Sequence, residues 1–237
     1  MCSSDLFFPD LRRASQVMAG QSPSRLAMEL FLEAELPRLS PPRQLDVIEI
    51  GCGSGSMAAR IAGFGYGGTY LGIDIQDRFR RDQPLAFAFE AAFQQTDAHA
   101  FSPPQRYDLM LSSSALEHIP DDTVLIRRLP SFMKPGGVEV HVLPSGASLA
   151  TYLWHGYRQY TPVVLAERFG DDIEIVRLGG LGSYLLHGLF ITGPEMLLHR
   201  SLRKAMPRIY LALLRAALRI DRVIPVCPNA YAVIRRH

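Results

Sequence analysis

Cysteine is scarce in this sequence. The 237 residues contain three cysteines, Cys2, Cys52 and Cys227, which lie far apart and include no C-x-x-C pair. A disulfide framework needs paired cysteines, and a structural zinc site needs cysteines or histidines at ligand spacing. We therefore expect a reduced, cytoplasmic setting and no bound metal.

Long hydrophobic runs and a secretory leader are also missing. No window reaches the roughly 18 uninterrupted apolar residues of a membrane span, and residues 1–13 show no basic start followed by a long apolar stretch. We expect a soluble or peripheral protein. Because 48% of the residues are hydrophobic, the chain can bury one large α/β core.

The net charge of +2 hides an uneven distribution. Residues 196–237 contain nine lysines and arginines and one acid, Asp221, whereas residues 1–195 carry a net charge of −6. Such an asymmetry predicts a surface near the C-terminal end that meets an anionic partner. Nucleic acid and a lipid headgroup layer are both candidates at this point.

Alternating apolar runs and helical patterns predict the fold. One or two helices are expected in residues 10–39, with a stop at Pro37, followed by a linker at 40–44. Strands are expected at 45–50, 68–75, 106–113, 136–143, 172–180 and 230–236, and 86–93 is ambiguous between strand and helix.

This order predicts a doubly wound, mostly parallel, seven-stranded sheet. We expect a single domain over 1–237, with an N-terminal helical cap (1–44), a cofactor-binding core (45–180), a basic helical insert (181–229) and a last strand (230–237).

A glycine-rich turn follows the first predicted strand. Residues 47–55 read VIEIGCGSG, so Gly51, Gly53 and Gly55 alternate directly after an apolar run. In an open α/β sheet, ligands bind beyond the carboxyl ends of the strands, where glycines let backbone N–H groups approach them. A tight structural turn would use the same glycines, so the turn alone leaves both interpretations open.

Two acids near the turn indicate the kind of ligand. A dinucleotide fingerprint reads G-x-G-x-x-G, but here position 56, the place of the last glycine, is serine. Glu49 lies two residues before the turn, and an acid at this position repels phosphates but suits a ligand with an ammonium group. Asp74, at the end of the next predicted strand, lies where a carboxylate binds a ribose diol. An amino acid joined to a ribose is the combination found in S-adenosylmethionine.

Several motifs together resemble those of the class I S-adenosylmethionine-dependent methyltransferases, over roughly residues 40–145. VIEIGCGSG resembles the first motif of this family, and YLGIDI, TDAHAF, YDLMLSSSALEHIPD and LPSFMKPGGVEVHVLP resemble its later ones. The resemblance implies a Rossmann-like methyltransferase fold and S-adenosylmethionine as the cofactor.

The resemblance also implies roles for the turn and the acids. Glu49 would orient the glycine loop and the methionine ammonium group, and Gly51 and Gly53 would line the methionine and the ribose. Asp74 would hold the ribose hydroxyls. A solvated residue at a strand end is the alternative for Asp74.

Five further positions complete the expected cofactor site. By resemblance, Asp97 with Ala98 would meet the adenine amine, although aspartates in loops also cap helices. Ser112 would face the cofactor near its sulfonium. Cys52, a small packing residue in the turn, and Ile75 complete the set.

His118 is the candidate general base for a hydroxyl acceptor. It follows the fourth core strand, where the transferred methyl group should point, and the pKa of a histidine suits proton removal near neutral pH. A histidine that only orders the loop is the alternative. His141 and Glu117 are further candidates for the base.

The segment after the fifth core strand predicts the acceptor. Five aromatic or imidazole side chains lie within nine residues, Tyr152, Trp154, His155, Tyr157 and Tyr160. Such a cluster suits a sugar or another ringed substrate, or it packs an amphipathic insert onto the sheet.

Residues 195–225 form a basic amphipathic pattern. Apolar residues recur near helical spacing beside arginines and Lys204, and Pro207 is expected to break or kink the run. Packing of the apolar stripe onto the chain's own sheet is the default. Docking on a partner, or on an anionic membrane, is the alternative.

The sequence thus predicts an S-adenosylmethionine-dependent O-methyltransferase. A glycan or lipid-linked sugar is the favoured acceptor, a small aromatic or polyketide-like metabolite is the second, and a non-catalytic S-adenosylmethionine-binding protein is a third hypothesis. A nucleic-acid acceptor is not expected, because SSSALEH lacks the N/D-P-P-Y/F type of motif that binds a flipped base. A nicotinamide oxidoreductase would share the fold but not Glu49 or the glycine spacing.

Overall fold

Residues 4–7, 21–41, 43–79, 89–151 and 158–237 are described by a computed structural model. The chain divides into two compact units. The first consists of residues 1–34, 144–162 and 175–232, and the second of residues 35–143, 163–174 and 233–237. The expected division of one domain at residues 44, 180 and 229 stays a prediction.

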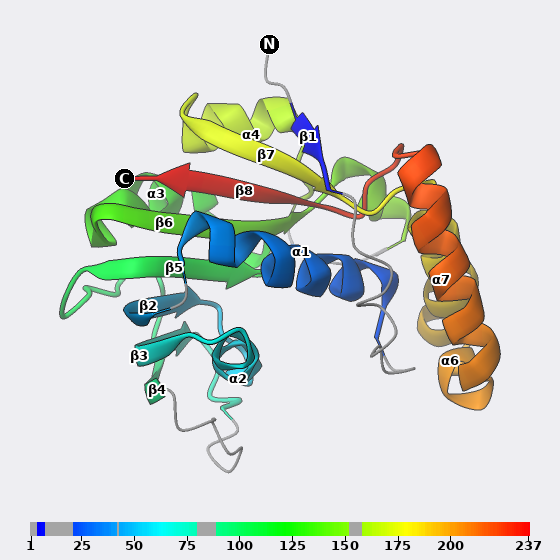
Figure 1. Cartoon of the computed structure of the whole chain (residues 1–237), viewed down its shortest axis with the longest axis horizontal. Coiled ribbons are helices and arrows are strands. Elements are labelled where there is room, and N and C mark those ends of the chain that lie inside the picture. Colours follow the sequence, from blue (N-terminus) through cyan, green and yellow to red (C-terminus); the bar gives the residue numbers. More distant parts are fainter. Residues whose placement is uncertain (1–3, 8–20, 42, 80–88, 152–157) are drawn as a thin grey trace. The chain divides into compact units, whose positions relative to one another are not determined.

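The second unit alternates strands and helices. Along the chain it contains β2 (Gln44–Ile50), α2 (Ser56–Gly63), β3 (Gly67–Asp74), β4 (Phe89–Gln95), β5 (Tyr107–Ser113), η2 (Leu116–His118), α3 (Asp122–Arg128), η3 (Leu129–Phe132), β6 (Met133–Pro144) and α4 (Pro162–Phe169) (Figure 1). Its central strands are apolar runs such as LDVIEI, whose side chains are almost all buried. Strands buried on both faces of a parallel sheet need this composition.

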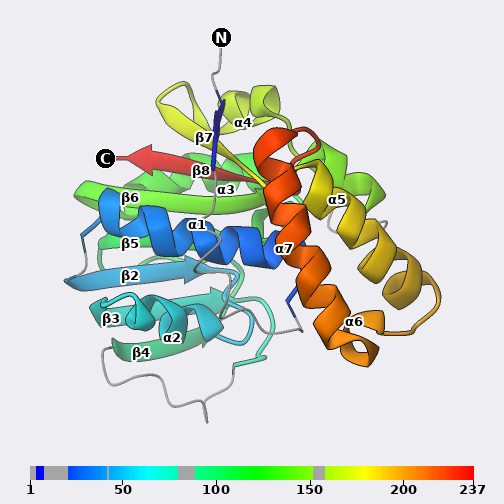
Figure 2. The ribbon, with the colours of Figure 1, turned by 45° about the vertical axis from the view of Figure 1, so that its right-hand side comes forward.

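The strands follow the order β1-β7-β8-β6-β5-β2-β3-β4, where β7 is Ile173–Leu178 and β8 is Ala230–Arg236. The pairs β1/β7, β2/β3, β2/β5, β3/β4 and β5/β6 are all parallel. Figure 2 shows β8 running in the opposite direction to β2 and β3. The predicted α/β, doubly wound, mostly parallel sheet is therefore confirmed.

The six predicted strands are confirmed within a few residues of their expected bounds. The ambiguous segment 86–93 is resolved as β4 from Phe89 onward, and residues 86–88 lie outside the described part of the chain. Strand β4 pairs along its whole length with β3. Backbone pairing, which no local pattern reveals, thus decides between strand and helix.

The predicted number of strands was wrong: within the described residues, the sheet has eight strands instead of seven. The additional strand, β1 (Ser4–Leu6), has three residues that pair with Ile175, Val176 and Arg177 of β7. A three-residue strand has no hydrophobic period, and it is held by a pairing partner about 170 residues away. The sequence therefore carries no local signal for it.

The first unit is mostly helical. It contains η4 (Gly146–Ala150), α5 (Leu181–His187), the π-helical segment η5 (Gly188–Leu197), α6 (Leu202–Ala205) and α7 (Pro207–Val223), together with most of α1 (Pro23–Leu39). Leu26 and Leu30 of α1 pack in a buried cluster with Phe190 of η5 and Tyr210 of α7. No helix in the described ranges is both long and apolar enough to cross a membrane.

Two prolines behave differently. Pro37 was expected to end the first helix, but α1 continues to Leu39, and the N–H of Ser40 donates to the carbonyl of Leu36 at 2.9 Å. A proline in the last turn removes only its own N–H donor. The hydrogen bonds donated by the residues after it can still form, so the helix continues past Pro37. At Pro207 the expected break is confirmed, because α6 ends at Ala205 and α7 begins at Pro207.

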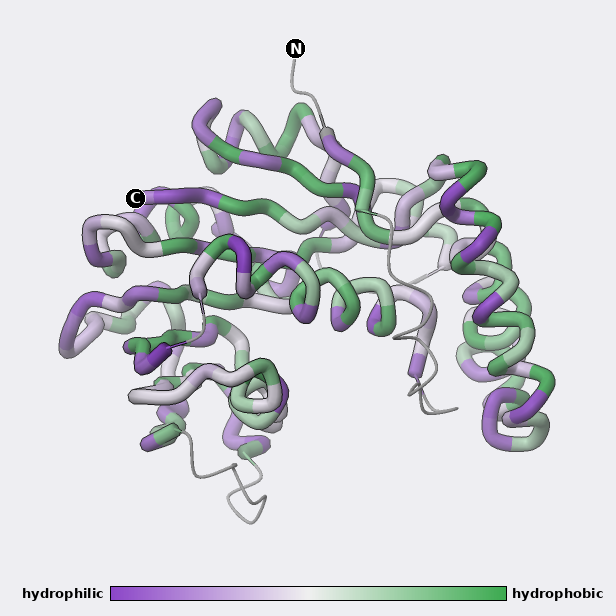
Figure 3. Tube along the Cα trace, in the orientation of Figure 1, coloured by the Kyte–Doolittle hydropathy of each residue, from purple (hydrophilic) through white to green (hydrophobic). Residues whose placement is uncertain are grey.

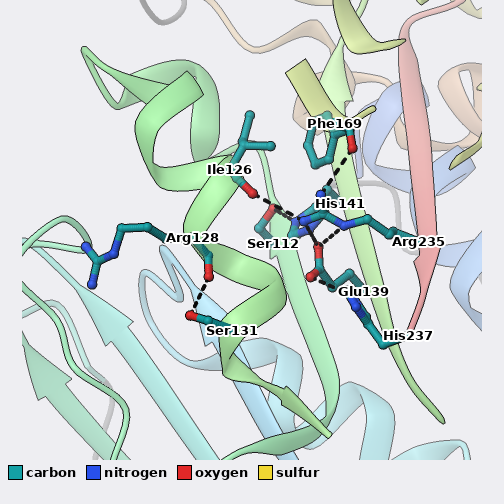
Figure 4. A network of polar contacts seen from close by, with 9 residues as sticks. All are labelled: Ser112, Ile126, Arg128, Ser131, Glu139, His141, Phe169, Arg235 and His237. Carbon is teal, nitrogen blue, oxygen red and sulfur yellow. Dashed lines mark hydrogen bonds and ion pairs between the residues drawn. The ribbon is translucent and has the colours of Figure 1, made fainter. Parts of the chain in front are cut away.

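A buried ion pair holds the second unit together. The Glu139 carboxylate of β6 accepts hydrogen bonds from Arg235 Nη2 at 2.5 Å, His237 Nε2 at 2.8 Å and His141 Nε2 at 3.1 Å (Figure 4). Arg235 also donates to the carbonyl of Phe169 at the end of α4. Burial would raise the pKa of Glu139, but the hydrogen bonds and charges around it lower that pKa to about 2.

Replacing Arg235 tests this pair. We expect Arg235→Met to lower the free energy of unfolding by about 3–5 kcal/mol, because it leaves a buried carboxylate without its cation. Arg236→Met is the matched control: its 3.2 Å pair with Glu174 is exposed, so a change below about 1 kcal/mol is expected. Urea unfolding of both variants measures the difference, and equal effects would contradict the assigned role.

Candidate active site

The glycine turn directly follows β2 and is hydrogen-bonded to the end of β3. Gly51, Gly53 and Gly55 all have positive φ angles, of 71°, 54° and 76°. The N–H groups of Gly51 and Cys52 both donate to the carbonyl of Ile73, at 2.8 and 3.0 Å. These bonds fix the turn against the end of β3, and the φ angles require glycine.

The three glycines differ in what surrounds them. A Cβ at Gly51 would overlap the Cβ of Ala115, and one at Gly55 would overlap the ring of Phe93. A Cβ at Gly53 would have no heavy atom within 4 Å. Gly51 and Gly55 are therefore needed for packing, whereas Gly53 faces open space that a ligand can occupy.

Asp74 bridges the glycine turn and the end of β3. Its Oδ2 accepts from the N–H of Gly53 at 2.8 Å, and its Oδ1 accepts from the N–H of Gln76 at 2.9 Å. A carboxylate offers about four lone-pair positions, so two backbone bonds leave room for two further donors. The geometry fits a diol that donates one hydrogen bond to each oxygen.

Glu49 lies buried beneath the turn. The hydroxyl of Tyr70 donates to its Oε2. Burial raises the pKa of the Glu49 carboxyl to about 8, and the nearby charge of Asp74 contributes to the rise, against the opposing effects of Tyr70 and Arg60. The carboxyl is therefore mostly protonated at neutral pH, and a cationic group placed beside it would favour the charged form.

The turn after β4 lies next to Asp74. The N–H of Thr96 donates to the Asp74 carbonyl at 2.8 Å, and Asp97 Oδ1 accepts from the N–H of His99 at 2.8 Å. Asp97 thus orders its own turn, the structural role that the sequence left open. Ala98 lies in the same turn, and Ile75, directly after Asp74, is 66% exposed. An exposed apolar side chain here fits contact with a flat base.

Two expected cofactor residues, Cys52 and Ser112, have buried side chains. The Cys52 side chain is buried and packs near Gly72 and Phe93, so a ligand would meet its backbone only. Burial also raises the pKa of its thiol. The Ser112 hydroxyl is buried and lies 2.8 Å from His141 Nδ1 (Figure 4). Both cofactor contacts stay predictions.

His118 ends the short helical turn η2, which follows β5. Its side chain is 48% exposed, and its Nε2 lies 4.0 Å from Oε1 of the buried Glu117. Ala115, at the start of this loop, is the residue that packs against Gly51. The loop carrying His118 is therefore held directly beside the glycine turn. His141 is fully buried, which removes it as a direct base.

Sequence reasoning missed Tyr70 as the partner of Glu49. A signal existed, since Tyr70 lies four residues before Asp74 on the strand that pairs with β2.

Of the aromatic cluster, Tyr160 is fully buried, whereas Tyr152, Trp154, His155 and Tyr157 lie outside the described residues. Within the described ranges, no group of three or more His, Cys, Asp or Glu residues could hold a metal ion.

These residues fit S-adenosylmethionine. Gly53 leaves the space for a ligand, Asp74 offers both carboxylate oxygens to a ribose, and Ile75 offers an apolar surface to a base. Glu49 is mostly protonated in the free protein and would ionise beside an ammonium group beneath the turn. When bound, this cofactor supplies an electrophilic methyl group.

A family model described as "Methyltransferase domain" matches residues 24–169. Among curated proteins, the chain is similar to a ubiquinone biosynthesis O-methyltransferase of Serratia proteamaculans, with 32% identity over 46% of this chain and 45% of the relative. It is also similar to a trans-aconitate 2-methyltransferase of Deinococcus radiodurans, with 29% identity over 50% and 45%. The chain thus spans less than half the length of these relatives.

Solved structures share the fold. A methyltransferase dependent on S-adenosylmethionine from Archaeoglobus fulgidus has a TM-score of 0.56 at 19% identity, covering 90% of this chain and 95% of the other. The N-methyltransferase NodS from Bradyrhizobium japonicum, in complex with S-adenosylhomocysteine, has a TM-score of 0.55 at 18% identity, covering 73% and 91%. The [4+2]-cyclase SpnF has a TM-score of 0.58 at 18% identity, covering 92% and 84%.

Substitution of Asp74 tests the ribose contact. We expect Asp74→Ala to weaken S-adenosylmethionine binding by about 2–3 kcal/mol, because charge-assisted hydrogen bonds are lost. Asp74→Asn, which keeps one carbonyl oxygen for the Gly53 N–H, should lose less. Calorimetry measures both constants, and an unchanged constant in a folded Asp74→Ala variant would remove Asp74 from the site.

The raised pKa of Glu49 predicts proton release on binding. Below pH 8 the carboxyl of the free protein is mostly protonated, and an ammonium group beside it should lower its pKa. Near pH 7 we therefore expect the binding of S-adenosylmethionine to release close to one proton from the Glu49 carboxyl of the wild type. The Glu49→Gln variant lacks this carboxyl and should not release that proton. Calorimetry in buffers of different ionisation enthalpy counts the protons. Equal release from both proteins would contradict this role.

The family model covers more than half of the chain, and the sheet of the second unit shows the same fold as solved methyltransferases. The glycine turn, Asp74 and Glu49 offer the groups that the shared cofactor needs. The chain belongs to the methyltransferase domain family, and its site fits S-adenosylmethionine as the cofactor.

Proposed function

We propose that this chain is an O-methyltransferase that methylates a hydroxyl group of a glycan or lipid-linked sugar of the cell envelope. The observation that carries the O-transfer is the placement of a half-exposed histidine, His118, on a loop that packs against the cofactor turn through Ala115 and Gly51. The name of the O-methyltransferase relative from Serratia proteamaculans supports oxygen as the methylated atom.

The side chains around His118 suit proton removal. His118 Nε2 would take the proton of the acceptor hydroxyl as its oxygen bonds to the methyl carbon, while the bond between that carbon and the cofactor sulfur would break with its electron pair left on sulfur. Glu117 Oε1, 4.0 Å from that nitrogen, then faces the imidazolium and stabilises its charge. A half-exposed imidazole can also return the proton to water after product release.

A small aromatic or polyketide-like metabolite is the second candidate acceptor. Both curated relatives carry names of metabolite pathways or small acids, and neither name mentions a sugar. The buried Tyr160 cannot contribute an open aromatic face, which weakens the sugar argument from the aromatic segment. The net charge of +8 over residues 196–237 supports a lipid-linked acceptor and a location at the inner face of a membrane.

Methyl transfer from radiolabelled S-adenosylmethionine tests the acceptor class. Purified protein is incubated in parallel with lipid-linked oligosaccharides, soluble glycans and phenolic metabolites. We expect base-stable label in the lipid-linked sugar fraction, since ethers survive mild alkali and esters do not. Label in the phenolic pool alone would replace the first candidate by the second, and alkali-labile label would contradict transfer to a hydroxyl.

His118→Ala tests the base. We expect kcat to fall by roughly 10²–10⁴, with the dissociation constant for S-adenosylmethionine nearly unchanged, because the side chain acts on the acceptor only. His118→Gln, which keeps a polar side chain for loop contacts, should be equally inactive. A His118→Gln variant with wild-type turnover would show that the residue orders the loop. Wild-type turnover in both variants would exclude His118 altogether.

A further inference from the structure

Helix α7 presents two separate apolar rows. Tyr210, Leu214, Ala217 and Leu218 form the first row, which is buried in the cluster of the first unit. The second row is exposed and consists of Ile209 (54% exposed), Leu213 (40%), Ile220 (44%) and Val223 (80%). The sequence predicted a single apolar stripe, with packing on the chain itself as the default and a partner or a membrane as the alternatives. The structure divides it, and only the first row holds the helix in place.

The exposed row is continuous along the helix. Each residue of an α-helix turns the chain by about 100°, so side chains at 209, 213, 220 and 223 fall within an arc of about 80°. Two further exposed apolar side chains, Ile224 and Val226, follow directly after the helix. The row is thus an apolar strip as long as α7, on the side of the helix next to its packed face.

A row of arginines borders the exposed strip. Arg208, Arg215, Arg219 and Arg222 are all exposed and lie on the flank away from the packed face. The only acid of α7, Asp221, is buried and accepts a hydrogen bond from the N–H of Ser183 at 2.9 Å. The accessible faces of α7 therefore carry positive charge and apolar surface but no acid, and Figure 3 shows hydrophilic and hydrophobic residues alternating along it.

The charge pattern decides what this surface fits. Pairing with α7 of a second copy would bring two arginine rows together without an acid on either helix to compensate them. A layer of anionic lipid headgroups places phosphates beside the arginines and acyl chains beside the apolar strip. Arg203 does not belong to this surface, because its guanidinium is bound to Glu195 at 2.6 and 2.8 Å.

We propose that α7 is a membrane-docking helix that lies in the interface of an anionic bilayer. The side chains of Ile209, Leu213, Ile220 and Val223 enter the boundary between headgroups and acyl chains, and the arginines contact lipid phosphates. This surface rests on the proposed membrane location and deepens it, but it requires no methyl transfer. Exposed leucines of α5 and η5 (Leu185, Leu189 and Leu197) add apolar area to the same unit.

Co-sedimentation of the full chain with vesicles tests the proposal. The vesicles contain phosphatidylcholine alone or with increasing phosphatidylglycerol, at low and at high salt. We expect binding only with phosphatidylglycerol, and weaker binding at high salt, because surface charges are screened beyond about 10 Å at 0.1 M salt. No binding of the wild type to any anionic vesicle at low salt would overturn the proposal.

Three variants separate the contribution of the α7 arginines, the contribution of the exposed apolar row and the effect of the protein's net charge. Replacing Arg208, Arg215 and Arg219 with Gln should weaken binding by about a hundredfold, at roughly fivefold for each arginine near the surface. Replacing Ile209, Leu213 and Ile220 with Ser should reduce binding at least tenfold, since these side chains are exposed in the free protein and their loss spares the core. The control replaces Arg43, Arg106 and Arg127, exposed arginines of the second unit, with Gln.

The control has the same net charge as the first variant and should bind like the wild type. Equal losses in both arginine variants would overturn the proposal, because binding would then follow net charge alone. Wild-type binding by the Ser variant would remove the apolar strip from the interface. A wild-type dimer that the Ser variant dissociates would assign the strip to a second copy. S-adenosylmethionine binding, measured on each variant, checks the catalytic unit independently and should not change.

Discussion

The carboxylate of Asp74 is the contact on which the candidate site depends. It accepts the N–H of Gly53 and thereby joins the carboxyl end of β3 to the turn that follows β2. The bonds from Gly51 and Cys52 to the Ile73 carbonyl reinforce the same junction. Because β2 and β3 are parallel and paired in register, both strands end together, and a single acid can serve the turn and a ligand at once.

The site also places acidic groups where they are unfavourable without a ligand. Glu49 is buried close to Asp74, and its pKa of about 8 records the free energy that its ionisation would cost. A cationic ligand beside Glu49 would lower this cost. We therefore expect the site to favour a ligand that carries an ammonium group.

Much of this site is predictable from sequence because its signals are local. The apolar run before Gly51, the glycine spacing and the interval to Asp74 all lie within 28 residues, and the strands around them have the expected bounds. Strand β1 is different, since it pairs with a strand about 170 residues away. The buried pair of Glu139 and Arg235 likewise joins residues 96 positions apart. Only the folded backbone brings such residues together.

Helix α7 shows a further limit of sequence patterns. Its two apolar rows merge into one broad hydrophobic face in the sequence, and exposure in the folded chain separates Leu213 from Leu214. In the same way, the sequence counts Arg203 with the other basic residues, although Glu195 already neutralises it. The periodicity identifies the helix, but the packing decides which of its faces meets solvent.

The central claim is that the glycine turn, Glu49 and Asp74 together select S-adenosylmethionine. Calorimetric titration of the wild-type chain with S-adenosylmethionine and, separately, with NAD⁺ tests this most directly. The Asp74 carboxylate, the open space at Gly53 and a Glu49 carboxyl that ionises beside a cation predict saturable binding of one S-adenosylmethionine per chain and no measurable heat with NAD⁺. Saturable NAD⁺ binding without S-adenosylmethionine binding would contradict it.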